Sequence, residues 1–170
     1  MVAPMFRVPS LFRVSPEFRP EWGLPNPDTQ VALTISGKIC WPNCGDAMEL
    51  DAPLLRQFPQ HELATTTDWP NLKGPQHFQG VAIIDLLLAA GWRGNHITVE
   101  GADGYSADAF LPELKRSNAI VATEWNGMPM PCTKFAPLWL VFPYDDAETQ
   151  MERWSQRRLS VWKLTNIHID

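Results

Sequence analysis

The Asn126-Gly127 dipeptide is the sequence feature that most constrains how this chain can fold. Both residues tolerate the positive φ that a tight two-residue turn requires, so this pair between strand-like residues predicts a β-hairpin. The apolar run at 137–142 follows, bounded by Pro143. A run this short favours a fully buried strand over a helix. The sequence therefore predicts a hairpin followed by a core strand.

The composition is that of a soluble globular protein. With 170 residues, 45% of them hydrophobic and 19% charged, the chain can bury the core of one domain. The longest apolar run, 81–90, is interrupted by Asp85 and has about half of the ~20 residues that a membrane-spanning helix needs. The net charge is -5 and the basic residues are dispersed, which argues against a nucleic-acid partner. We expect a small-molecule or protein partner.

Residues 1–28 have the composition of an extended arm, and residues 29–170 that of a folded domain. Six prolines interrupt the arm, and Phe-Arg recurs at positions 6, 12 and 18. The even spacing would place the three phenylalanines on one side of an extended chain. The arm either packs across its own domain or docks on another subunit, which would make a homo-oligomer. Without a signal-peptide pattern we expect a cytoplasmic protein as written, and a periplasmic one if Met1 begins a trimmed chain.

Strands outnumber helices in the predicted domain. Alternation and β-branched content predict strands at 31–36, 61–67, 97–102, 119–125, 137–142 and 161–169, with a return strand from Tyr105 and a bulge between Leu164 and Ile167. Short helices are predicted from the N-cap Asp51 to Pro59, at 81–90, at 112–116, and from the N-cap Asp146 to Arg158. The connections are too short for repeated βαβ units, so the predicted class is α+β.

The helix predicted at 81–90 should bury one face. Ile83, Ile84, Leu87, Leu88 and Gly91 fit helical spacing, with Gly91 as a left-handed C-terminal residue, and Ile84, Leu87 and Leu88 are expected to face the sheet. The apolar face is expected to pack against the sheet that contains Leu138 and Leu140. This helix is the longest apolar one predicted.

Cys40 and Cys44 flank three residues that must turn. A turn could bring their Cα atoms within the ~4.4–6.8 Å that a disulfide needs. Two unrelated thiols are the alternative. Metal binding is the weakest interpretation, because no CxxC motif or paired histidine accompanies them.

The remaining polar residues form no familiar catalytic motif. The four histidines (His61, His77, His96 and His168) show no i, i+4 pair, which favours structural or surface roles over a zinc site. Ser106 and Ser160 lie outside any Gly-x-Ser-x-Gly elbow, so a Ser-His-Asp triad is not indicated.

A basic and aromatic group at the C-terminal side is the best candidate ligand site read from the residues. It comprises Arg153, Trp154, Arg157, Arg158 and Trp162. A guanidinium fork and an indole face could hold a phosphate and a flat ring. The alternative is a solvated helix face with aromatic core neighbours.

Four motifs in this order carry a resemblance to a known family. They are F-x-G-V-x-x-x-x-L-L at 78–87, D-G-Y at 103–105, N-G-x-P at 126–129 and A-P-L-x-L-V-x-P at 136–143. Over about residues 29–170 the chain resembles the sulfite-oxidase-type molybdopterin-binding domain. The resemblance implies an α+β fold around a mixed sheet. In active members one molybdopterin and one cysteine thiolate hold a molybdenum ion that passes an oxygen atom to or from a small substrate. Cofactor contacts are expected from Asn71, Asp103, Tyr105, Arg157 and Arg158.

The chain departs from this family pattern where the chemistry takes place. The thiolate of active members lies in the loop that corresponds to residues 68–77, and that loop contains no sulfur here. Asp68 or Thr67 would offer only a hard oxygen ligand. Phe135 and Trp139 stand where many members carry glycine and arginine.

We therefore expect a protein of this fold that has lost the molybdenum–thiolate chemistry and works as a binding or accessory module. Bound molybdopterin remains an open expectation. One rival hypothesis is an active molybdopterin-dependent oxidoreductase that uses Asp68 or a displaced Cys132. The other is a structural interaction protein whose contact is the Phe-Arg arm.

Overall fold

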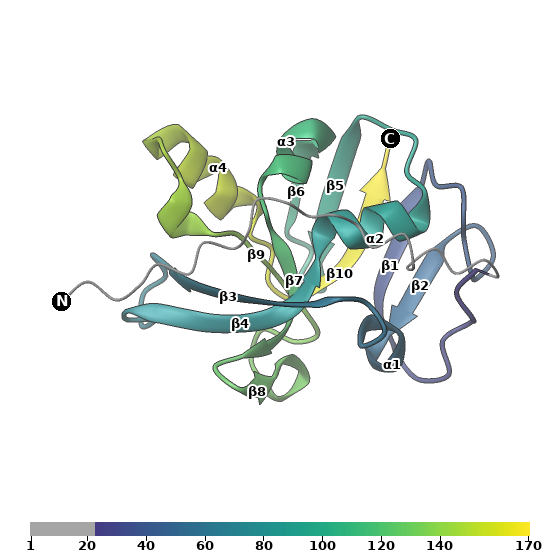
Figure 1. The fold of residues 1–170 in the computed structure, drawn as a ribbon, viewed down its shortest axis with the longest axis horizontal. Helices are drawn as coiled ribbons and strands as arrows, with labels where there is room; N and C mark the ends of the chain where they lie inside the picture. The colour runs from purple at the N-terminus through teal and green to yellow at the C-terminus, as the bar shows by residue number, and fades with distance from the viewer. Residues whose placement is uncertain (1–22) are drawn as a thin grey trace.

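Two five-stranded sheets organise the described part of the protein, residues 23–170 of a computed structural model (Figure 1). The first sheet has the order β2-β1-β10-β5-β6, and its strands are β1 Val31–Gly37, β2 Met48–Asp51, β5 His96–Gly101, β6 Ser106–Phe110 and β10 Leu164–Ile169. β1 and β10 pair in parallel and the other neighbours are antiparallel. The predicted α+β class and the mixed sheet are confirmed. The Phe-Arg repeats of the predicted arm lie outside the described residues.

The second sheet contains the predicted hairpin. Its strands are β3 Gln60–Thr66, β4 Pro75–Ala82, β7 Ile120–Trp125, β8 Met128–Pro129 and β9 Trp139–Val141, and both β8 and β9 pair with β7. Asn126 and Gly127 have φ of 49° and 76°, as a turn between β7 and β8 requires. All three residues of β9 are buried. The hairpin and the core strand after it are therefore confirmed.

Four short α-helices and two 3₁₀-helices connect the described strands. They are α1 Ala52–Leu55, α2 Ile83–Ala90, α3 Leu111–Arg116, α4 Gln150–Leu159, η2 Met130–Cys132 and η3 Tyr144–Asp146. The Asp51 carboxylate caps α1 as predicted, accepting a hydrogen bond from the Leu54 N–H at 2.9 Å. The prediction that Asp146 caps α4 is wrong. Asp146 lies in η3, and Thr149 caps α4 by accepting from the Glu152 N–H at 3.1 Å.

The start of the second predicted helix is also corrected. Residues 75–82 form the strand β4, so α2 begins two residues after Val81. Gly80 shows why: β4 lies between β3 and β7, and a Cβ on Gly80 would come within 2.0 Å of the Val121 carbonyl oxygen. Burial alternates along residues 75–79, but the buried positions include the polar Gln76, so hydrophobicity does not alternate there. Residues 80–82 are all buried, and a short buried run cannot be told from a helix by periodicity.

The buried side of α2 also differs from the prediction. The buried residues are Ile83, Leu86, Leu87 and Ala90, at positions i, i+3, i+4 and i+7 from the true start. Leu87 was predicted correctly. Ile84 and Leu88 are only partly buried, so their assignment to the core face is wrong. Gly91 ends the helix at a φ of 64°, as predicted.

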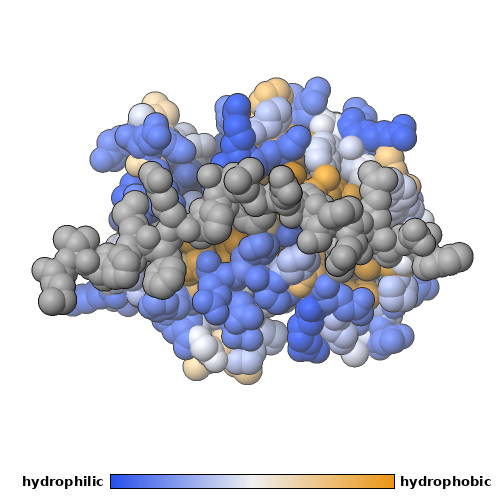
Figure 2. Space-filling model, in the orientation of Figure 1, coloured by the Kyte–Doolittle hydropathy of each residue, from blue (hydrophilic) through white to orange (hydrophobic). Residues whose placement is uncertain are grey.

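The two sheets meet along the segments 135–141 and 161–164. The Leu140 N–H donates to the Val161 carbonyl at 2.9 Å, and the Leu164 N–H donates to the Leu138 carbonyl at 2.8 Å. β10 then continues from Leu164 with the predicted bulge, seen as a register shift against β5 before Asn166. Hydrophilic residues cover much of the face drawn in Figure 2, and hydrophobic residues show mainly along its middle. No helix in the range 23–170 is long and apolar enough to cross a membrane.

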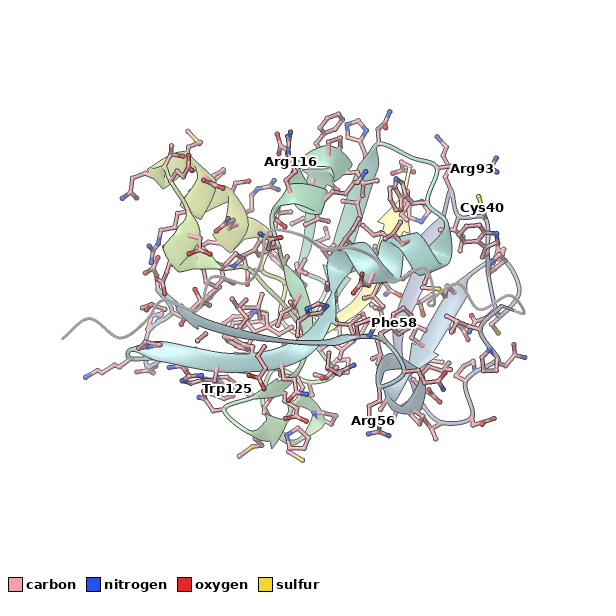
Figure 3. The ribbon with its side chains drawn as sticks, in the orientation of Figure 1. Cys40, Arg56, Phe58, Arg93, Arg116 and Trp125 are labelled. Atoms are coloured by element: carbon pink, nitrogen blue, oxygen red, sulfur yellow. The ribbon has the colours of Figure 1, made fainter. Side chains whose placement is uncertain are left out.

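The two cysteines near the end of β1 are free thiols, so the disulfide is not present. Their side chains face different neighbours. The Cys40 sulfur accepts a hydrogen bond from Nε of Arg93 at 2.7 Å (Figure 3). Cys44 lies in a tight turn with Ala47, and its thiol donates to the Glu49 carboxylate, which raises the pKa of Cys44. The structure therefore shows two separate thiols, which was one of the alternatives left open by the sequence.

Candidate functional site

Asp68 begins the loop between β3 and β4 and is held by helix α4. Its two carboxylate oxygens accept hydrogen bonds from Nε and Nη2 of Arg153, both at 3.1 Å. Nη1 of Arg157 lies 3.7 Å from the same carboxylate. The two arginines are four residues apart, so they project from one face of α4. The loop is thus tied to the helix by a bidentate ion pair.

This pair sets the charge state of both groups. The hydrogen bond from Arg153, opposed by partial desolvation, lowers the pKa of Asp68, and Asp68 in turn raises the pKa of Arg153. Asp68 is consequently an ionised acceptor at neutral pH. Its oxygens already face guanidinium donors.

A pocket of about 390 Å³ opens beside this pair. Its lining consists of Asp68, Gln150, Arg153, Trp154 and Arg157. The Trp154 side chain is 61% exposed, which is unusual for an indole. Two guanidinium groups and an accessible aromatic face can bind an anion that carries a flat group. We call these five residues the arginine pocket.

The protein interior next to Asp68 is packed with aromatic side chains. This aromatic cluster comprises Trp69, Phe78, Trp125, Phe135, Trp139, Tyr144 and Trp162. Trp139 is fully buried, and its ring centroid lies 5.5 Å from that of Trp69 and 4.4 Å from that of Phe135. Phe135 also stacks on Trp162 at 5.1 Å. The cluster joins the loop after β3 to the line where the two sheets meet.

Ser160 serves as the polar centre of this cluster. Its hydroxyl donates to the Leu140 carbonyl at 2.8 Å and accepts from Nε1 of Trp139 at 3.0 Å. The buried Tyr144 hydroxyl also bonds to it, and burial raises the pKa of Tyr144. Since the single Ser160 proton is directed to a backbone carbonyl, these contacts describe a structural hydroxyl rather than a nucleophile.

Three other predicted cofactor residues lie together beside β6. Nη2 of Arg158 donates to the Asp108 carbonyl at 2.8 Å, and the Tyr105 hydroxyl donates to the Arg158 carbonyl at 2.8 Å. Asp103 accepts from the Tyr105 N–H at 3.2 Å. Arg158 is thus engaged with β6, while Arg153 and Arg157 face Asp68.

Asn71 and Cys132 lie apart from these groups. Asn71 is exposed, with a φ of 76°, in the turn that the Leu72 N–H closes on the Trp69 carbonyl at 3.2 Å. Cys132 is exposed in η2, after β8. In Figure 1 α4 and β8 lie on opposite sides of the β3–β4 pair. The structure therefore does not bring Cys132 to Asp68.

Two of the four histidines contact carboxylate side chains. Nε2 of His61 lies 3.3 Å from Asp85, and His168 contacts Ser36 and Asp170. Across residues 23–170 no three His, Cys, Asp or Glu side chains are grouped as metal ligands. Sequence reasoning did not single out Trp69, because its partners are more than 65 residues away in the chain and no local spacing signals them.

Comparison with known proteins establishes the family. The model of the oxidoreductase molybdopterin binding domain matches residues 33–156. The chain belongs to this family, which confirms the resemblance seen in the motifs.

The fold comparison agrees. The crystal structure of the sulfane dehydrogenase SoxCD from Paracoccus pantotrophus is similar with a TM-score of 0.60 and 15% sequence identity. The match covers 86% of this chain and 40% of that one, so this chain spans well under half of its length. No curated protein sequence matches.

The residues at the family's metal position do not fit a molybdenum–thiolate centre. The loop after β3 supplies the Asp68 carboxylate in place of a soft sulfur, and both of its oxygens are bonded to Arg153. At two further positions where many members carry glycine and arginine, Phe135 and Trp139 are buried rings.

Proposed function

We propose that this family member has lost molybdenum–thiolate catalysis and acts as a binding or accessory module. The observation that carries the proposal is the bidentate Asp68–Arg153 pair at the position of the family's thiolate. This carboxylate is a poor candidate for a metal ligand, because both of its oxygens already accept from Arg153 and because a carboxylate is a hard ligand where the family uses a soft thiolate. The family's reaction therefore lacks its protein ligand here.

The aromatic cluster supports the same proposal. Phe135 and Trp139 are 2% and 0% exposed, and their rings pack on each other. An arginine at position 139 would supply a cation, and a glycine at 135 would leave space. The two rings provide neither a positive charge nor free space. They therefore favour a packed interior over a cofactor cleft.

The ligand that best suits the module is a small anion with a flat group, bound in the arginine pocket. Arg153 and Arg157 supply guanidinium donors, and the exposed face of Trp154 supplies a stacking surface. Asp68 now neutralises part of that positive charge. An incoming anion would compete with Asp68 for the two arginines.

The first test is the metal and pterin content of the full chain expressed in a molybdenum-replete host. We expect well under one molybdenum per chain, because the protein offers no thiolate in the loop after β3. A Cys132→Ala variant is the control and should leave the content unchanged. Near-stoichiometric molybdenum and pterin, with oxygen-atom transfer abolished by Asp68→Ala or Cys132→Ala, would instead establish the active oxidoreductase.

The second test is anion binding by the arginine pocket, with inorganic phosphate and a flat aryl phosphate as probes. Asp68→Asn should tighten binding of phenyl phosphate by roughly tenfold, since it removes a competing carboxylate worth on the order of one charged hydrogen bond. Arg153→Gln should weaken binding by a similar factor.

Arg157→Gln should also weaken binding, and the matched control is Arg158→Gln, because Arg158 bonds to β6 and not to Asp68. Titration calorimetry or NMR gives the affinities. Equal affinity of wild type and Asp68→Asn, or loss of binding in Arg158→Gln alone, would contradict the assignment of this pocket.

A further inference from the structure

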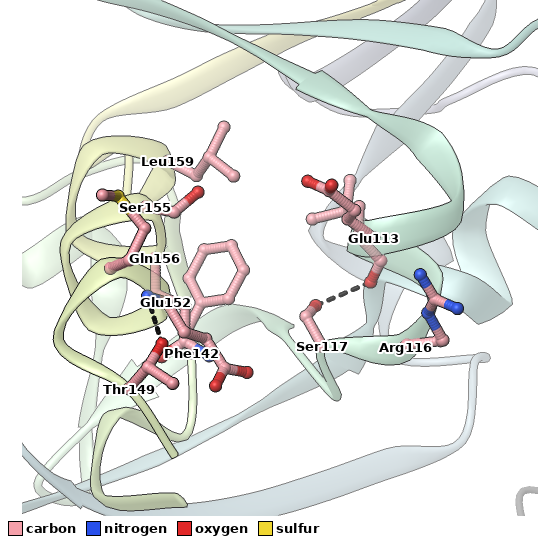
Figure 4. A pocket seen from close by; sticks show the side chains of 11 residues that line it. Glu113, Arg116, Ser117, Phe142, Thr149, Glu152, Ser155, Gln156 and Leu159 are labelled. Atoms are coloured by element: carbon pink, nitrogen blue, oxygen red, sulfur yellow. Dashed lines mark hydrogen bonds between the residues drawn. The ribbon is translucent and has the colours of Figure 1, made fainter. Parts of the chain in front are cut away.

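A second pocket lies between α3 and α4. It has a volume of about 420 Å³, within the range of small-molecule sites. Its apolar floor is formed by Leu114, Phe142 and Leu159, which are 2%, 1% and 6% exposed. Figure 4 shows the Phe142 ring between the two helices. The pocket can therefore cover an apolar group of a ligand.

A single buried amide oxygen makes this pocket chemically specific. Gln156 projects from α4 into the pocket lining and is only 7% exposed. Its Oε1 is buried, and no donor within residues 23–170 bonds to it. An unsatisfied buried acceptor is destabilising, so this oxygen favours any ligand that brings an N–H or O–H group.

The rim of the pocket selects the charge of that ligand. Glu113 from α3 and Glu152 from α4 line it, together with the single cation Arg116. Within the described chain no ion pair engages Glu113. Two carboxylates against one guanidinium leave the rim acidic, which favours a positively charged group over a negatively charged one.

We propose that this pocket binds a small organic cation whose apolar body rests on Phe142 and whose protonated nitrogen donates to Oε1 of Gln156, after a rotation of the side-chain amide brings this buried oxygen to the pocket surface. Amidines and benzylic amines, which are protonated at neutral pH, belong to this class. The apolar body covers Leu114 and Leu159, and Glu113 attracts the positive charge at the rim.

This site is separate from the arginine pocket. Gln156 and Leu159 line it, whereas Arg153 and Arg157 reach Asp68. The two sites also prefer opposite charges. Cation binding in this pocket therefore does not depend on the loss of molybdenum chemistry or on anion binding in the arginine pocket.

The test compares benzamidine, benzyl alcohol and benzoate as probes of the full-length protein by NMR titration. Benzamidine should bind most tightly and benzoate least, with chemical-shift changes at residues of α3 and α4. Gln156→Met keeps the side-chain length and removes the acceptor. It should weaken benzamidine binding by about tenfold, which corresponds to one hydrogen bond.

Charge variants and a matched control complete the experiment. Glu113→Gln, at an exposed position, should weaken benzamidine binding severalfold, and Arg116→Gln should leave it unchanged or tighter. Gln57→Met, an exposed glutamine far from the pocket lining, is the control for the glutamine exchange. Should Gln156→Met fail to fold, the two charge variants still decide the matter.

Four results would overturn the proposal. The first is benzoate binding at least as tightly as benzamidine, and the second is an unchanged affinity for benzamidine in both Gln156→Met and Glu113→Gln. The third is chemical-shift changes confined to parts of the molecule other than α3 and α4. The fourth is no detectable binding of any probe at millimolar concentration.

Discussion

Asp51 connects the chain before β1 to helix α1 through one carboxylate. Its Oδ1 accepts from the Leu54 N–H at 2.9 Å. Its Oδ2 accepts from the N–H of Asp28 at 3.0 Å and from the N–H and hydroxyl of Thr29, both at 2.9 Å. The side chain is 1% exposed. Burial alone would raise the pKa of Asp51, but these four donors outweigh burial and lower it.

The lowered pKa predicts how stability depends on pH. The folded-state pKa lies below the unfolded value of about 3.9, so the stabilisation is complete above about pH 5 and is lost as pH falls through the folded pKa. The free energy of unfolding of the wild type should therefore exceed that of Asp51→Asn at pH 7, and the gap should narrow toward pH 3. Urea denaturation at several pH values measures this gap. A gap that stays constant or widens in acid would contradict the assignment.

At the scale of elements, the packing of α2 on its neighbours decides which of its faces is buried. The helix contacts β4 and α3 and buries Leu87 completely, while Leu88 is only partly buried. The helix begins two residues later than predicted, and its buried stripe is counted from Ile83 rather than Ile84. A shift of the stripe by one residue is enough to exchange its members.

Truncation variants test this buried face. Leu87→Ala should reduce the free energy of unfolding by roughly 2–5 kcal/mol, through lost transfer energy and the cavity left behind. Leu88→Ala, next to it and partly exposed, is the matched control and should cost clearly less. Chemical denaturation midpoints at constant m-value decide between them. Equal losses would mean that the helix is rotated from its assigned orientation.

At the scale of the whole molecule, one line of contacts joins the two sheets. The Lys163 N–H donates to the Phe135 carbonyl at 3.1 Å, next to the paired Trp139 and Trp162 backbones. The aromatic cluster packs over this line. β9 belongs to one sheet and β10 to the other, so the packing here should couple their unfolding.

Replacing the central ring tests that coupling. Trp139→Ala should cost about 3–5 kcal/mol, the range for large aromatic truncations in a core. Trp154→Ala removes an indole that is 61% exposed and should change stability by no more than about 0.5 kcal/mol. Far-UV and near-UV circular dichroism should report a single transition in both variants. Separate transitions for the two signals in Trp139→Ala would show that unfolding is no longer two-state and would contradict the coupling.

Local sequence patterns predicted much of the fold but little of the candidate site. The Asn126-Gly127 turn, the Asp51 cap, the Gly91 stop and the bulge after Leu164 were all predicted, because each depends on backbone preferences within a few residues. The strand β4 was not predicted, since its buried positions include the polar Gln76 and its last three residues are all buried, so hydrophobicity does not alternate along it.

The sequence by itself determined the α+β class, the family and the missing sulfur in the loop after β3. Only the tertiary structure decided what occupies that region. Asp68 meets Arg153 across 85 positions of the chain, and the aromatic cluster combines Trp69 with Trp139 and Trp162. Such contacts depend on how the sheets pack rather than on the residues nearby in sequence, so no local spacing could have revealed them.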